Sequence, residues 1–251
     1  MRVGVFDSGV GGLSVLKSLY EANLFDEFIY YGDTARVPYG VKDKDTIIKF
    51  CLEALEFFKK MQIDMLILAC NTASAWALDV LRKNCNFAVY GVIDAGVEAT
   101  KNAINDKSKE ILVIATKATI NSKEYQTHLA KLGFSNVKAI ATGLFVPMVE
   151  EGIFEGEFLK SAMNYYFKGI KSPDALILAC THFPLISKAL SEYFGDKTLL
   201  IHSGTAMVDF LKKRENLQIK TQRARLEFHA TSDISSLKNT AKIWLNLKDI
   251  K

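Results

Sequence analysis

The amino-acid sequence predicts an α/β protein made of two similar lobes, and two observations carry that prediction. The first is a stretch that occurs twice: residues 64–72 read DMLILACNT and residues 174–182 read DALILACTH, an offset of 110 residues. The second is the alternation of short apolar runs with amphipathic segments along the chain, which is typical of parallel sheets flanked by helices. Self-similarity at a fixed offset indicates a repeated structural unit.

Each copy of the repeated stretch is predicted to be a buried parallel strand that ends in a cysteine. A short apolar run bounded by polar residues fits such a strand. Cys70 and Cys180 follow the two runs directly. Because ligands of open α/β sheets bind outside the carboxyl ends of the strands, we expect one thiol from each half at a ligand-binding edge.

The first half begins with a strand over residues 3–6, the glycine-rich turn DSGVGG and a helix over 13–20. Glycines let the backbone approach a ligand, so Asp7 and Ser8 are candidate ligand contacts; the alternative is a plain turn with Asp or Ser as helix cap. After a strand over 28–31, Tyr39 and Gly40 lie in a loop that either covers a site or only turns the chain. Helices over 46–60 and 75–83 and a strand over 88–92 follow from the apolar spacing.

The second half repeats this order. After a helix over 97–104, a strand over 111–115 lies about 109 residues beyond the first strand, and its end carries Thr116 and Thr119 where the first half has Asp7 and Ser8. The spacing further predicts strands over 137–141, 199–201 and 226–230, and helices over 122–131, 146–151, 156–167, 184–193, 206–213 and 234–245. We expect one lobe from residues 1–92 and 206–251, a second from 93–205, mainly parallel sheets, and the active site in the cleft between them.

Composition and charge argue against several classes of protein. The net charge of +4 is small and the basic residues are scattered, so we expect no nucleic-acid partner. No apolar run is long enough to span a bilayer, and Asp7 interrupts the first one, so we expect neither a membrane segment nor a signal peptide. The four cysteines include no CxxC pair, which disfavours a zinc or thioredoxin-type site. Free thiols indicate a reducing compartment, here the cytoplasm.

Two thiols that face one cleft from opposite sides form an acid/base pair. A free thiol has a pKa of roughly 8.5, and a helix N-terminus after each strand would favour the thiolate. A thiolate can take a proton from one face of a carbon while a thiol returns one to the other face, which inverts that carbon. Asn71 and Thr72 in one half, and Thr181 and His182 in the other, would hold carboxylates, with His182 also stabilising a thiolate.

Three other interpretations of the cysteines remain open at this point. The pair would form a redox disulfide, or bind a metal together with His182, although the absence of CxxC disfavours both. Cysteines of buried strands are also often inert core residues. We interpret Cys51 and Cys85 in that last way, whereas the repetition of the strand–cysteine–polar pattern favours chemistry at Cys70 and Cys180.

Four motifs in the same order, FDSGVGGLSVL, YYGDTARVPYG, LILACNTAS and LILACTHFPL, resemble those of the glutamate racemase family across almost the whole chain. The resemblance implies two pseudo-symmetric α/β lobes and the interconversion of L- and D-glutamate without a cofactor or a metal, supplying D-glutamate for peptidoglycan. It also implies a homodimer. Two alternatives stand beside it: an aspartate racemase of the same superfamily, since one methylene of substrate cannot be read from sequence, and a non-catalytic regulatory protein that binds an amino acid.

The resemblance also implies the site residues. Cys70 and Cys180 become the two acid/base thiols, Asp7 and His182 assist the cysteine in their own half, and Glu150 is a further catalytic candidate. The implied substrate contacts are Asp7, Ser8, Tyr39, Gly40, Asn71, Thr72, Thr116, Thr119, Thr181 and His182.

Overall fold

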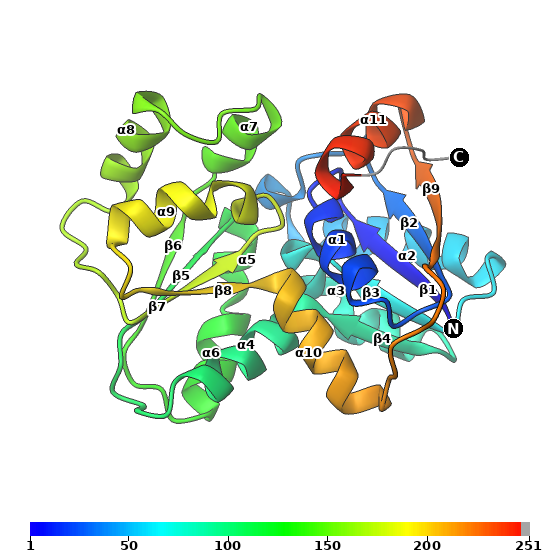
Figure 1. The fold of residues 1–251 in the computed structure, drawn as a ribbon, viewed down its shortest axis with the longest axis horizontal. Coiled ribbons are helices and arrows are strands. Elements are labelled where there is room, and N and C mark those ends of the chain that lie inside the picture. The colour runs from blue at the N-terminus through cyan, green and yellow to red at the C-terminus, as the bar shows by residue number, and fades with distance from the viewer. Residues whose placement is uncertain (247–251) are drawn as a thin grey trace.

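A computed structural model describes residues 1–246, and Figure 1 shows two α/β lobes side by side. The first lobe has a five-stranded sheet in the order β4-β3-β1-β2-β9, with every neighbouring pair parallel. Its strands are β1 (Arg2–Asp7), β2 (Glu27–Gly32), β3 (Met65–Leu68), β4 (Ala88–Gly91) and β9 (Arg225–Ala230). The helices around it are α1 (Leu13–Ala22), α2 (Lys44–Lys60), α3 (Asn71–Lys83) and α11 (Ile234–Leu245), with the 3-10 turn η1 (Tyr39–Val41).

The second lobe repeats the first four strands of the first lobe in the same spatial order. Its parallel sheet runs β6-β5-β7-β8. The strands are β5 (Ile111–Ala115), β6 (Val137–Ala141), β7 (Ala175–Ala179) and β8 (Leu199–His202). The helices are α5 (Lys117–Ser122), α6 (Glu124–Lys131), α7 (Phe145–Glu150), α8 (Glu157–Tyr166) and α9 (Ser187–Phe194), with the 3-10 turn η2 (Phe183–Ile186). Two further helices, α4 (Val92–Ala103) and α10 (Ser203–Glu215), lie between the lobes. The predicted fold class is therefore confirmed, and β9 is an addition at the edge of the first sheet.

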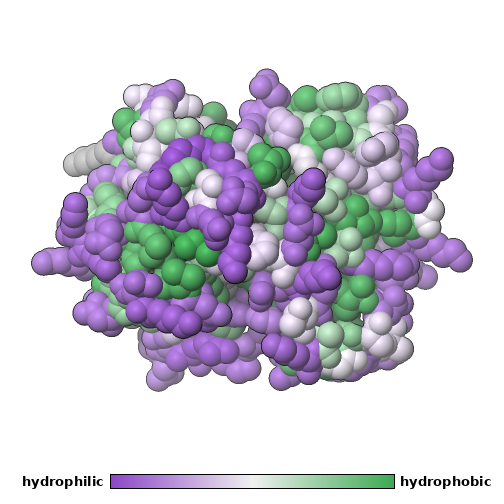
Figure 2. Space-filling model, turned by 180° about the vertical axis from the view of Figure 1, so that it is seen from behind, coloured by the Kyte–Doolittle hydropathy of each residue, from purple (hydrophilic) through white to green (hydrophobic). Residues whose placement is uncertain are grey.

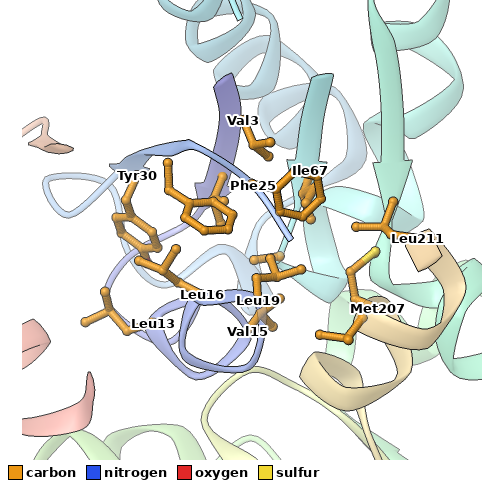
Figure 3. Close-up of a cluster of buried hydrophobic side chains, with 14 of the residues drawn as sticks. Val3, Leu13, Val15, Leu16, Leu19, Phe25, Tyr30, Ile67, Met207 and Leu211 are labelled. Carbon is orange, nitrogen blue, oxygen red and sulfur yellow. The ribbon is translucent and has the colours of Figure 1, made fainter. Parts of the chain in front are cut away.

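Both faces of each sheet are covered, as a parallel sheet requires. On β1, Val3 and Val5 pack with α1, α10 and α11, while Phe6 packs on the other face with α2 and α3. Figure 3 shows part of the first of these clusters, with Leu16 and Leu19 of α1 and Met207 and Leu211 of α10 beside Ile67 of β3. Full burial of one such side chain contributes about 1.5–3 kcal/mol. These two layers fix β1 and β3, and so the strand ends that carry the site.

Three helices begin earlier than the spacing predicts. Helices α3 and α4 start at Asn71 and Val92, directly after the cap residues Cys70 and Gly91, and α10 starts at Ser203. The predicted helix over 122–131 is instead two helices, because Lys123 adopts the left-handed conformation (φ 60°) that ends α5. The early starts place helix N-termini directly at the carboxyl ends of the strands.

The lobes meet at α4 and α10, which pack on each other and lie at the junction in Figure 1. The lobe boundaries near residues 93 and 205 stay a prediction, and residues 247–251 of the predicted first lobe lie outside the described part of the chain. Within residues 1–246, no helix combines the length and apolar character needed to cross a bilayer. On the face shown in Figure 2, hydrophilic side chains cover much of the surface, and apolar ones gather in separate patches.

Candidate active site

Cys70 lies between β3 and α3, at the carboxyl end of the first sheet. Its side chain is only 5% exposed, and its Sγ accepts a hydrogen bond from the Ala73 backbone N–H at 3.4 Å, which caps α3. The thiol donates to Ser8 Oγ at 3.5 Å, so the turn after β1 also contacts it. The strand end, the helix start and the glycine-rich turn together hold this sulfur in place.

Burial decides the ionisation of Cys70. Removal from water, with the charges of Asp7 and Cys180 adding to it, raises the pKa of the thiol to about 12, and the hydrogen bonds with Ser8 and Ala73 oppose this more weakly. A helix N-terminus is worth about 0.3–1 kcal/mol, which is less than one pKa unit at about 1.4 kcal/mol per unit. The start of α3 does favour the thiolate through the Ala73 N–H, but burial outweighs it, so the Cys70 group is a thiol near neutral pH.

Cys180 occupies the matching position after β7 but has a different neighbour. Its Sγ lies 3.7 Å from His182 Nδ1, and His182 Nε2 lies 3.0 Å from Glu150 Oε1 at the end of α7. The segment that follows is the 3-10 turn η2 rather than the predicted α-helix, so the α-helix proper starts only at Ser187. An imidazole therefore stands beside Cys180, where a helix start stands beside Cys70.

His182 keeps its proton at neutral pH. Burial alone would lower the pKa of its imidazole, but the hydrogen bonds with Cys180 and Glu150, helped by the charge of Asp7, raise that pKa to about 10. An imidazolium between a sulfur and a carboxylate stabilises negative charge on the sulfur. The two sulfurs therefore differ in what stands beside them, the start of α3 at Cys70 and an imidazolium at Cys180.

Asp7 lies behind the thiols and accepts a hydrogen bond from the opposite lobe. The carboxylate is fully buried; it accepts from the Gly9 N–H at 2.9 Å and from Thr181 Oγ1 at 3.4 Å. Burial raises the pKa of this carboxyl, although the positive charge of His182 and the bonds from Gly9 and Gly12 oppose that rise. The side chain acts on the site through Thr181 and through its charge.

Three threonine hydroxyls form a closed ring across the lobes. Thr72 Oγ1 lies 2.9 Å from Thr116 Oγ1 and 3.1 Å from Thr119 Oγ1, and the last two are 3.0 Å apart. Gly40 packs on this ring so closely that a Cβ there would come within 2.6 Å of Thr116 Cβ. The hydroxyl of Tyr39 is already used, because it donates to the buried Asp33 carboxylate.

A cavity of about 410 Å³ brings most of the predicted residues together. Its wall includes Ser8, Tyr39, Gly40, Cys70, Asn71, Thr72, Thr116, Glu150, Cys180, Thr181 and His182. Asp7 and Thr119 lie behind that wall, in hydrogen-bonding contact with residues that form it. Within residues 1–246, no cluster of three or more His, Cys, Asp and Glu side chains is arranged to hold a metal ion.

Sequence reasoning missed part of the wall, namely Gly9, Val37, Pro38, Val41, Lys117, Gly143, Val146, Pro147 and Ala179. Two of them carried a usable signal. Val146 and Pro147 precede Glu150 by four and three residues on α7, and side chains at that spacing share one helix face. Val37 and Val41 reach the cavity only because the loop between β2 and α2 folds over it.

Gly11 is glycine because the opposite lobe leaves no room for a side chain. A Cβ there would lie 2.3 Å from Thr181 Oγ1 and 2.6 Å from His182 Cε1. We expect Gly11→Ala to push both side chains away from Cys180 and to lower kcat/KM by about 10- to 100-fold. Steady-state kinetics check this, with a thermal melt of the same sample to show that the fold is kept. Wild-type kinetics in Gly11→Ala would mean that the positions of Thr181 and His182 do not matter.

Comparison with known proteins identifies the family of this chain. Residues 13–211 match the family model described as Asp/Glu/Hydantoin racemase. A curated glutamate racemase from Campylobacter jejuni is 75% identical over 98% of this chain and 99% of its own length. A crystal structure of a glutamate racemase from Campylobacter jejuni subsp. jejuni covers all of both chains at 74% identity with a TM-score of 0.98. A Francisella tularensis glutamate racemase, solved in complex with D-glutamate, is 34% identical with a TM-score of 0.86, covering 98% of this chain and 93% of its own.

The chain therefore belongs to the Asp/Glu/hydantoin racemase family. Within that family it is a member of the glutamate racemases, which makes it an isomerase.

Proposed function

We propose that this chain interconverts L- and D-glutamate by a two-cysteine acid/base mechanism without a cofactor. The observation that carries the proposal is the pair of buried thiols, Cys70 and Cys180, which follow equivalent strands of the two lobes and line one cavity. The 75% identical relative from Campylobacter jejuni is named a glutamate racemase, and the Francisella tularensis structure contains D-glutamate. Both support glutamate as the substrate.

The different neighbours of the two sulfurs give the order of steps. Cys180, beside the His182 imidazolium, acts as the thiolate that removes the α-proton of one enantiomer. The Cys70 thiol then delivers its proton to the opposite face of the α-carbon, which completes the inversion. After turnover Cys180 carries the proton and Cys70 lacks one, and the other enantiomer reacts with this form by the same steps in reverse.

The carbanion formed between these two transfers needs stabilisation, because the α-proton is a weak acid. The first backbone N–H groups of a helix have no partner within it and favour negative charge. Asn71 and Thr72 supply such groups at the start of α3, beside Cys70. They stabilise the charge that develops on the substrate α-carboxylate, and the low exposure of both thiols keeps water from weakening these contacts.

The remaining parts of the proposal rest on the family resemblance. We infer that the product supplies D-glutamate for peptidoglycan synthesis and that the chain works as a homodimer. The four free cysteines, Cys51, Cys70, Cys85 and Cys180, fit a reducing compartment and so the cytoplasm. Structures of aspartate racemases or their homologues are 16–19% identical to this chain, a level that supports a common fold alone, so substrate length is a question for experiment.

The first test follows the circular dichroism of L-glutamate with purified, reduced protein and no added pyridoxal phosphate. Enantiomers have equal free energies, so we expect the signal to decay to zero, with the same end point from D-glutamate. Decay with aspartate but not glutamate would change the substrate and keep the mechanism. A flat trace with both amino acids would favour the non-catalytic binding protein.

A further inference from the structure

A buried chain of hydrogen bonds behind the cavity connects the two cysteine strands. Tyr125 OH donates to Asn71 Oδ1 at 2.8 Å, and Asn71 Nδ2 donates to Ser203 Oγ at 3.5 Å. Ser203 Oγ then donates to the backbone carbonyl of Leu178 at 3.2 Å. The three side chains lie in residues that are at most 2% exposed. Polar groups buried to this degree hold their partners firmly, because water cannot replace them.

The two ends of this chain of hydrogen bonds lie close in sequence to the two thiols. Asn71 follows Cys70 directly, and Leu178 stands two residues before Cys180 on β7. Tyr125 comes from α6 in the second lobe, and α4 leaves space for it, since a Cβ at Gly96 would come within 3.1 Å of the Tyr125 hydroxyl. The Tyr125 side chain therefore lies where three parts of the protein meet, namely the first turn of α3, helix α4 and the second sheet.

The same contacts occupy the Asn71 side chain. Its oxygen accepts from Tyr125 and its nitrogen donates to Ser203, so both ends of the amide are bound within the protein. A substrate contact at Asn71 then uses the backbone N–H rather than the amide. The amide connects the first turn of α3 to the opposite lobe.

We propose that Tyr125 is a positioning residue for the racemisation, which fixes the separation of Cys70 and Cys180 through Asn71 and Ser203. Tyr125 does not line the cavity formed by the candidate site residues. The inference rests on the proposed two-cysteine function, in which both sulfurs must reach one α-carbon from opposite faces. A displacement of about 1 Å at a reacting group can cost about 100-fold in rate.

The test is Tyr125→Phe, which keeps the ring and removes only the hydroxyl. Asn71 Oδ1 is then left without that donor in the interior, and the first turn of α3 loses its anchor to α6. We expect kcat to fall by about 10- to 100-fold with either enantiomer, while KM stays within about threefold, because the groups that contact substrate are retained. A purely structural defect would lower apparent kcat only in proportion to the fraction of folded protein, so kcat is expressed per folded molecule, counted by circular dichroism and a thermal melt of the same sample.

Tyr90→Phe is the matched control, because the Tyr90 hydroxyl donates to Glu215 between β4 and α10, away from the cavity. We expect it to keep wild-type kcat. Ser203→Ala is the second probe, since it breaks the same chain at its other end. If the chain of hydrogen bonds acts as one unit, the second substitution adds little. The kcat of Tyr125→Phe/Ser203→Ala then lies within about twofold of that of the slower single variant.

Three outcomes would overturn the inference. They are a Tyr125→Phe kcat within twofold of wild type, an equal loss in Tyr90→Phe, or fully multiplicative effects in the double variant. Inactive wild-type protein in the same assay would instead contradict the proposed function itself, and this inference with it. Active wild-type protein with an unaffected Tyr125→Phe contradicts the positioning role alone.

Discussion

Alanine at Cys70 or at Cys180 is expected to abolish racemisation, with kcat falling by about 10⁴-fold or more in each single variant. Each thiol serves one face of the α-carbon, so the loss of either leaves one face without its proton carrier. Both side chains are small and buried, at 5% and 6% exposure, and alanine removes only the sulfur. The expected loss therefore reflects chemistry more than packing.

The loss must be equal in both directions. L- and D-glutamate have the same free energy, so the ratio of kcat/KM for the two directions is fixed at one in every variant. Exchange of the α-proton in D₂O separates the two thiols further. We expect any exchange left in Cys70→Ala to be confined to one enantiomer and that left in Cys180→Ala to be confined to the other, because the remaining thiol reaches only one face. Exchange of the same enantiomer in both variants would contradict the two-faced arrangement.

Cys85→Ala provides the matched control for these variants. Cys85 is half-buried, and its thiol donates to the carbonyls of Leu81 and Phe87 after α3, outside the cavity wall. We expect wild-type kcat and KM from it, measured by the same circular dichroism assay. Turnover within tenfold of wild type in either Cys70→Ala or Cys180→Ala would make the two-cysteine mechanism untenable.

The fold and the positions of the two site cysteines, Cys70 and Cys180, could be predicted from local sequence features. The repeat that ends in Cys70 and Cys180 is visible because a buried parallel strand is short, apolar and abruptly ended. The same repeat fixed the equivalence of the two sheets, since β1 to β4 and β5 to β8 take the same order. Polar residues directly after these strands could be assigned to the cavity, because parallel strands end at one edge.

Features that depend on tertiary packing were not predictable in this way. Val37 and Lys117 reach the cavity through the path of whole loops and helices, which no local pattern encodes. The raised pKa of the Cys70 thiol was not predictable either, because the helix start can be read from sequence but the depth of burial cannot. Tyr125 is one of nine tyrosines in the chain, and only the packing of α6 against α4 brings its hydroxyl to Asn71.

His182→Asn is expected to lower kcat by about 100-fold, the second largest effect. Asparagine places a nitrogen near the position of Nδ1 and so keeps a hydrogen-bond donor for Cys180, but it carries no charge. The variant therefore separates hydrogen bonding from charge at the sulfur. His128→Asn is the control, because His128 is a half-buried histidine of α6 that faces Asp94 and Glu124 outside the cavity wall.

The same variant makes a prediction about stability and pH. The folded-state pKa of His182 is raised from 6.5 to about 10, so the folded protein holds this proton more tightly than the unfolded chain does. The contacts with Cys180 and Glu150 therefore contribute stability that is fully present below pH 6.5, declines between pH 6.5 and about 10, and is lost above that range. Other groups titrate in both proteins, so their contributions largely cancel in the comparison.

Thermal melts of wild type and His182→Asn across pH 6 to 10.5 measure this directly. We expect the wild-type advantage in Tm to be largest at the acid end and to shrink steadily as the pH rises. An advantage that stays constant over this range would mean that the pKa of His182 is not raised in the folded protein. Cys180 would then have no imidazolium beside it above neutral pH, which would contradict the role proposed for His182.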